Sequence, residues 1–203
     1  MWCQWGSSRD RARHWGKTMR NHFIGPGGCG MHFMRSLFED EASCFTHTRR
    51  IDSVQKGDKV LYIFVDPYNA VLSYDRRGFL KQSHHVRNIE GDIEGFNQGS
   101  PWDLSKFLSN GTDFFLLYDH FNRWYMHHER EYEIAFVKYE SLSTSMDSVC
   151  EFFGLPHKQF SYKARNSDWN NLDEQELAML QSMYGDYHKV WSELPDFFIH
   201  KSS

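Results

Sequence analysis

The chain has 203 residues, which suits one domain with its own hydrophobic core and is short for two. Hydrophobic residues make up 40% of it, and the formal net charge of -4 gives no general attraction for nucleic acids or acidic membranes. No window approaches the roughly 18 consecutive apolar residues of a membrane span. We therefore expect no nucleic-acid partner, no membrane span and a cytoplasmic location, unless the sequence is a fragment of a longer Golgi-type protein.

The four cysteines, Cys3, Cys29, Cys44 and Cys150, are scattered without the CxxC spacing of zinc sites. A small disulfide scaffold is equally disfavoured, because the chain is long and its cysteines are few. We expect reduced thiols and no metal site.

Short apolar runs alternate with amphipathic stretches along the chain, in the manner of strands and helices. Residues 1–20 are polar and aperiodic and are predicted to be a loosely ordered lead-in, so residues 21–203 form the predicted single domain. The stretch 82–110 is loop-rich, and residues 79–112 are interpreted as a possible lid or acceptor-binding segment. The predicted strands are 22–24, 44–48, 59–65 and 133–139, and the predicted helices are 33–38, 70–78, 113–130, 143–153 and 172–194. This alternation predicts an α/β fold with a central parallel sheet flanked by helices in three layers.

A glycine-rich turn, Gly25 to Gly30, stands between the first strand and the first helix. Such a turn presents backbone N–H groups and the positive end of the helix dipole, which together hold a phosphate or sulfate. Met31 and His32 occupy the positions where a Walker A loop needs Lys and Ser or Thr, which disfavours a magnesium-dependent NTPase. Glycine clusters are also common in purely structural turns, so the neighbouring segments decide between the two interpretations.

Three further segments follow the loop in order. Phe45-Thr46-His47 ends the second strand, Val65-Asp66-Pro67 follows the third and is succeeded by Ser73, and Val137 to Leu142 precedes the helix that ends near Pro156. With the loop, these segments make the chain resemble the cytosolic-type sulfotransferases, a family with a P-loop-type fold that uses 3′-phosphoadenosine-5′-phosphosulfate (PAPS) as sulfuryl donor. The resemblance covers about residues 22–74 and 113–198.

The resemblance implies a sulfotransferase that moves a sulfuryl group from PAPS to a hydroxyl of a small molecule or glycan and releases adenosine 3′,5′-bisphosphate (PAP). It makes His47 the catalytic base, a role that suits an imidazole because it titrates near neutral pH. Ser73 would bind the 3′-phosphate, Phe33 would stack on the adenine and Tyr139 would approach it. The loop residues implied to bind the donor are Gly27, Gly28, Cys29, Gly30, Met31, His32 and Phe33.

The chain departs from the family pattern at two charged positions. Gly28 stands in place of the loop lysine, and Val65 stands in place of the arginine that grips the 3′-phosphate. A late Arg-Lys-Gly segment of the family also has no clear counterpart. We hypothesise that other cations substitute. The candidates for the lysine are Arg49, Arg50 and His32, and those for the arginine are Arg76 and Arg77.

Two alternatives remain open. The chain is either an active enzyme or a descendant of the same fold that binds a nucleotide or a partner without catalysis. A P-loop kinase is a third interpretation, which the absence of Lys and Ser/Thr after Gly30 disfavours, because nothing is placed to hold magnesium and a γ-phosphate. The sequence does not identify the acceptor or the oligomeric state.

Overall fold

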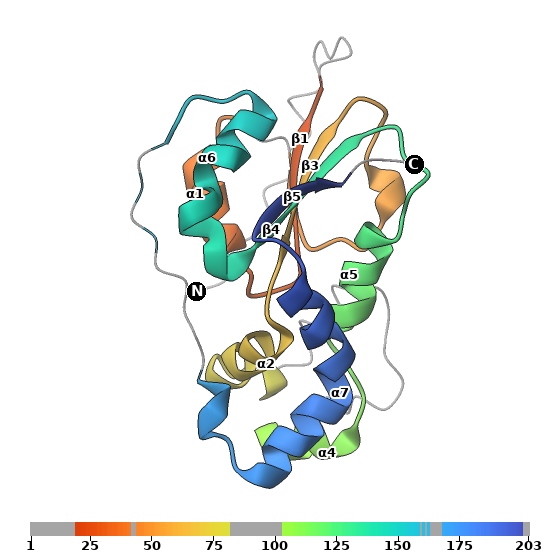
Figure 1. Cartoon of the computed structure of the whole chain (residues 1–203), viewed down its shortest axis with the longest axis vertical. Coiled ribbons are helices and arrows are strands. Elements are labelled where there is room, and N and C mark those ends of the chain that lie inside the picture. The colour runs from red at the N-terminus through yellow and green to blue at the C-terminus, as the bar shows by residue number, and fades with distance from the viewer. Residues whose placement is uncertain are drawn as a thin grey trace.

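The computed structural model describes residues 19–41, 44–81, 103–158, 160, 162 and 168–200 (Figure 1). They form a sheet of strand order β2-β1-β3-β4-β5. The first four strands are parallel, as predicted, and β5 runs antiparallel to β4. The strands are β1 (Asn21–Ile24), β2 (Cys44–Thr46), β3 (Lys59–Phe64), β4 (Glu133–Lys138) and β5 (Phe197–His200).

Helices cover both faces of this sheet. In Figure 1, α1 and α6 lie on one side of the strands and α5 on the other, while α2, α4 and the start of α7 gather beyond the carboxyl ends of the parallel strands. The predicted three-layer α/β fold of the P-loop type, with a central parallel sheet flanked by helices, is confirmed. The helices are α1 (Met31–Phe38), α2 (Pro67–Arg76), α4 (Leu104–Asn110), α5 (Leu117–Tyr125), α6 (Leu142–Phe153) and α7 (Glu174–Glu193). Short 3-10 turns are η1 (Ile51–Ser53), η2 (Phe79–Lys81), η3 (Tyr139–Ser141) and η4 (Trp169–Asn171).

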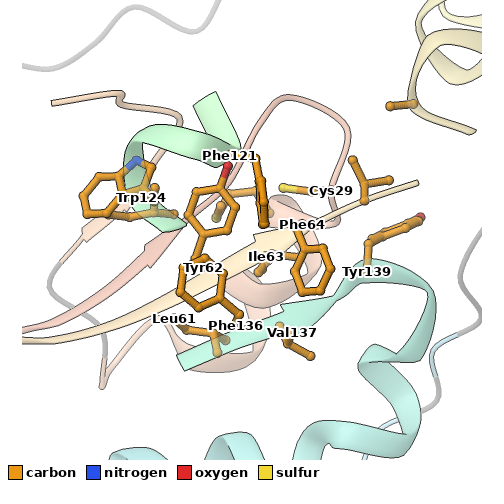
Figure 2. Packing of buried hydrophobic residues seen from close by; sticks show 14 of the residues in the cluster. Cys29, Leu61, Tyr62, Ile63, Phe64, Phe121, Trp124, Phe136, Val137 and Tyr139 are labelled. Atoms are coloured by element: carbon orange, nitrogen blue, oxygen red, sulfur yellow. The ribbon is translucent and has the colours of Figure 1, made fainter. Parts of the chain in front are cut away.

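Aromatic rings fill the core on both faces of the sheet. On one face, Phe23 of β1 stacks on Phe38 of α1, with ring centroids 5.1 Å apart. On the other, Tyr62 and Phe64 of β3 pack against Phe121 of α5 (Figure 2). Strands that are covered on both faces need apolar residues at every position. This explains why β3 reads as a continuous apolar run.

The sequence prediction was wrong for residues 104–110, which form α4 and not a loop. Asp103 caps this helix by accepting a hydrogen bond from the Lys106 N–H at 2.8 Å. Gly111 then ends it with a left-handed φ of 70°. Both signals are in the sequence, but the helix is too short for hydrophobic periodicity to reveal. The proposed lid segment otherwise falls largely on residues 82–102, outside the described residues.

The strand β5 was not predicted. It follows α7 directly, and its Phe198 ring stacks on Phe136 of β4 at 5.2 Å with an interplanar angle of 7°. The helix predicted over 113–130 is also shorter than expected, since α5 spans Leu117–Tyr125. Leu116, with a φ of 51°, separates it from the residues before it.

The lead-in predicted for residues 1–20 lies outside the described residues up to position 18. Arg20 already belongs to the folded unit, because its guanidinium pairs with Asp58 at 2.9 Å and its carbonyl accepts the Lys59 N–H at 2.9 Å. Among the helices described, none has the length and apolarity required to cross a membrane.

Candidate functional site

The glycine-rich loop joins β1 to α1 at the carboxyl end of the parallel strands, which is where α/β proteins usually bind ligands. Gly28 and Gly30 have φ values of 86° and 76°, so both adopt the left-handed conformation that glycine allows without strain. Gly30 is the N-cap of α1, and no side chain caps this helix. Backbone N–H groups in the first turn of a helix can bind an anion.

Gly25 brings the loop into close contact with β3. A Cβ atom at this position would lie 2.5 Å from the carbonyl oxygen of Ile63 and 2.6 Å from the sulfur of Cys29. Gly25→Ala is therefore expected to lower the free energy of unfolding by about 2–3 kcal/mol, measured by urea denaturation. Gly27→Ala is the matched control, because its Cβ would lie 3.5 Å from the Tyr74 hydroxyl, and its effect should stay within about 0.5 kcal/mol. Equal stability of the two variants would contradict the close approach.

Two of the predicted loop ligands have side chains that point into the core. Cys29 is fully buried, and burial raises the pKa of its thiol to about 12. Figure 2 shows it among the labelled residues of the core cluster. Met31 is also buried, whereas the side chain of His32 is exposed. Cys29 and Met31 can therefore contact a ligand only through their backbone N–H groups.

His47 follows β2 and contacts the first residue of the loop. Its Nδ1 lies 2.7 Å from the carbonyl oxygen of Gly25. A carbonyl oxygen can only accept, so Nδ1 carries the proton and donates it. In the neutral ring, Nε2 is then the unprotonated nitrogen. The contact fixes both the orientation and the tautomer of the imidazole that the resemblance makes the base.

A buried histidine on α5, His120, holds the backbone of His47. Its Nε2 donates to the His47 carbonyl at 3.0 Å, and its Nδ1 accepts from the Tyr62 hydroxyl at 2.6 Å. Burial lowers the pKa of His120 to about 4, so the ring is neutral at physiological pH. Trp124 adds a hydrogen bond from its indole N–H to the carbonyl of Thr48 at 3.1 Å. Sequence reasoning missed His120, whose only signal was a polar residue among the aromatic residues of α5.

The helix α2 places Tyr74 beside the loop. It begins after Asp66, whose carboxylate accepts the Tyr68 N–H at 3.0 Å. Ser73 is buried, and the neighbouring Tyr74 donates its hydroxyl to the carbonyl of Gly27. Val65, at 2% exposure, is buried where the family pattern has an arginine. The structure therefore brings α2 to the loop, with no cation at position 65.

Two of the candidate substitute cations are engaged in ion pairs away from the loop. Arg49 is buried and pairs with Asp119 of α5. Arg50 is exposed and pairs with Asp52 at 3.2 Å. Neither ion pair includes a residue of the glycine-rich loop.

Aromatic rings surround Gly30. A Cβ atom there would lie 3.0 Å from the Tyr139 ring and 3.1 Å from the Tyr162 hydroxyl oxygen. Tyr162 also stacks on Phe33, with centroids 4.2 Å apart and planes at 22°. The structure thus brings Phe33 and Tyr139 together at the loop. It adds Tyr162, which stands in an aperiodic stretch and gave no sequence signal.

Acidic residues lie at the carboxyl ends of β3 and β4. The Asp66 N–H donates to Glu140 Oε1 at 3.1 Å, and burial raises the pKa of Glu140 to about 7. His188 of α7 contacts the Asp66 carboxylate at 3.0 Å and stacks on Tyr68 at 4.1 Å. These contacts hold α7 against the carboxyl ends of β3 and β4. No group of three or more His, Cys, Asp or Glu suited to a metal ion occurs in the described part of the chain.

No protein-family model matches the chain, and no curated protein matches it. Among solved structures it is similar to the mouse sulfotransferase SULT7A1 complexed with PAP, at a TM-score of 0.42 and 15% sequence identity. The match covers 83% of this chain and 65% of that chain. What this chain does is therefore inferred from its own residues.

Proposed function

We propose that this protein transfers a sulfuryl group from PAPS to a hydroxyl group of a small-molecule or glycan acceptor. The observation that carries the proposal is the hydrogen bond from His47 Nδ1 to the carbonyl of Gly25, 2.7 Å long. It holds an imidazole, with Nε2 as the accepting nitrogen, at the rim of a loop suited to anions. Sulfuryl transfer requires a base next to an anion site.

In the proposed reaction, His47 Nε2 takes the proton of the acceptor hydroxyl as its oxygen attacks the sulfur. The new O–S bond forms while the bond from sulfur to the 5′-phosphate oxygen breaks, and PAP leaves with the negative charge. The backbone N–H groups of Gly28 to His32 would stabilise that charge, because preorganised donors stabilise charge as it develops. The neutral His120 keeps the backbone of His47 in place, since its Nε2–H donates to the His47 carbonyl.

The residues around the loop fit the phosphosulfate end of the donor better than its 3′-phosphate. Gly28 and Gly30 have left-handed φ values, and their Cβ atoms would lie 3.1 Å from the Tyr74 ring and 3.0 Å from the Tyr139 ring, so neither could carry a side chain without strain. The predicted 3′-phosphate ligands are Ser73 and the substitutes Arg76 and Arg77, and the buried Val65 supplies no charge. The second candidate function is a descendant of the fold that binds a nucleotide or a partner without catalysis.

A P-loop kinase is disfavoured by the chemistry of two side chains. Met31 is buried and has a thioether, which is a poor ligand for Mg²⁺. His32, the next residue, is exposed and supplies no oxygen ligand. The loop therefore offers neither the lysine nor the hydroxyl that hold a γ-phosphate and its magnesium ion.

Thermal unfolding with nucleotides tests the proposal. PAP at 100 times its Kd should stabilise the protein by about 2.7 kcal/mol. In a domain of this size that raises the Tm by about 5 °C or more. ADP, and ATP with magnesium, are the controls, and we expect clearly smaller shifts from them. An equal shift with ADP, or no shift with PAP, would contradict the PAPS proposal.

A further inference from the structure

The glycine-rich loop, Gly25 to Gly30, contains no lysine, arginine or histidine. We propose that Arg77, at the end of α2, supplies the positive charge for the anion bound in the loop. It would replace the lysine that the family pattern has at position 28. This inference rests on the proposed function and adds to it the residue that would neutralise the leaving phosphate. It also changes the role considered for Arg77 from the sequence, which was to replace the arginine missing at Val65.

The position of Arg77 is set by the C-terminus of α2. Its N–H donates to the Ser73 carbonyl at 3.2 Å, which ends the helix. Its guanidinium lies 5.8 Å from the centre of the Phe79 ring. The Nη1 atom is 3.9 Å from the point that a Cβ atom of Gly28 would occupy. The guanidinium therefore lies beside the loop backbone.

A glycine at position 28 is compatible with the position of the Arg77 guanidinium, whereas a larger residue would not be. Gly28 has a φ of 86°, and a Cβ atom there would come within 3.1 Å of the Tyr74 ring. A lysine at position 28 would therefore be strained and would run toward the guanidinium. With glycine, the space beside the loop stays open to the side chain that comes from α2. The absence of a lysine at position 28 is therefore what allows the guanidinium of Arg77 to lie beside the loop.

The charge of Arg77 is available to a ligand. The side chain is exposed, and it forms no salt bridge with any carboxylate in the described ranges. Its field reaches the loop, since the positive charge favours the ionised form of Cys29 and so opposes the burial that raises the pKa of that thiol. It acts in the same direction on Tyr74.

The chemistry of a guanidinium suits this position. Its planar donors can bind two oxygens of one phosphate, sulfate or phosphosulfate group at once. A hydrogen bond to a charged group contributes about 1.5–3 kcal/mol, which corresponds to a 10- to 100-fold change in affinity. The N–H groups of the loop would bind the same anion from the other side.

Titration calorimetry with two probes, PAP and inorganic pyrophosphate, tests the inference. The variants are Arg77→Ala and Arg77→Gln, with Arg123→Ala as the control that removes an equal charge from an exposed position on α5, where Arg123 pairs with Asp119 at 2.9 Å. We expect Arg77→Ala and Arg77→Gln to raise the Kd for both probes at least about 10-fold, and Arg123→Ala to raise it less than about 2-fold. The glutamine variant keeps most of the length of the side chain, so it decides the test if the alanine variant folds poorly.

The two probes separate the inference from the proposed function. If the wild-type protein binds PAP and the Arg77 variants bind it as tightly as the Arg123 variant, the inference is overturned and the proposed function stands. If pyrophosphate binds with dependence on Arg77 and PAP does not bind, Arg77 is the loop cation and the PAPS proposal falls. If the wild-type protein binds neither probe, both are overturned.

Discussion

His47→Ala is expected to lower the rate of sulfuryl transfer at least about 100-fold, because a positioned general base contributes about 10²–10⁴ to the rate. The binding of PAP should change less than about 2-fold, since the ring contacts the loop through a carbonyl oxygen and not through the N–H groups that would hold the ligand. The measurements are turnover of labelled PAPS with an acceptor that the wild-type protein sulfates, and calorimetry with PAP.

His157→Ala is the matched control for this prediction. His157 is exposed and pairs with Asp147 of α6 at 2.7 Å, and no residue of the loop takes part in that pair. Its removal should leave both turnover and PAP binding unchanged. A His47→Ala variant with near wild-type turnover would show that another group is the base. If the wild-type protein binds PAP tightly but sulfates none of the acceptors screened, the non-catalytic descendant becomes the better interpretation.

The second large effect concerns the pH dependence of stability. Burial raises the pKa of Glu140 from 4.5 to about 7. Between these values the folded protein holds a proton that the unfolded chain has released, so stability falls as the pH rises from about 4.5 to about 7. A shift of this size corresponds to about 3 kcal/mol over the whole range. Glu140→Gln removes the titrating group, so this loss should disappear.

His120 acts in the opposite direction over nearly the same range. Burial lowers its pKa from 6.5 to about 4, so the unfolded chain binds the extra proton and stability rises with pH across this interval. The two effects largely cancel in the wild-type protein. In Glu140→Gln the contribution of His120 is no longer offset, and stability should climb by about 3 kcal/mol between pH 4 and pH 6.5.

Urea denaturation at several pH values between 4 and 7.5 measures this effect. Glu133→Gln is the control, because Glu133 begins β4, the strand that leads to Glu140, but its side chain is 65% exposed. Its curve should run parallel to that of the wild-type protein. If the curve of Glu140→Gln is also parallel, the Glu140 carboxyl is ionised at neutral pH in the folded state and the predicted compensation is absent.

The features that the sequence predicted correctly are local. The apolar run that became β3 and the glycines before α1 each specify structure through residues close together in the chain. The placement of His47 beside the loop was also anticipated, but through resemblance to a family and not through any local pattern. Its role as the base stays a prediction.

The features that were missed depend on contacts between distant segments. His120 is 73 positions from the carbonyl that it holds, and no periodicity indicates such a pair. The antiparallel pairing of β5 with β4 depends on where α7 ends relative to the sheet. Arg77 comes near Gly28 only because α2 packs Tyr74 against the loop. Each relation arises from tertiary packing, which a single sequence does not display.

The ring of Tyr162 has a consequence for affinity. It lies against Phe33 at 4.2 Å, so an incoming aromatic base that used the same face would have to displace it. Such aromatic pairs contribute about 0.5–1.5 kcal/mol, which makes Tyr162 an internal competitor that weakens apparent binding by about 2- to 12-fold. That penalty is small for a nucleotide with several further contacts, and it selects against ligands that offer a base alone.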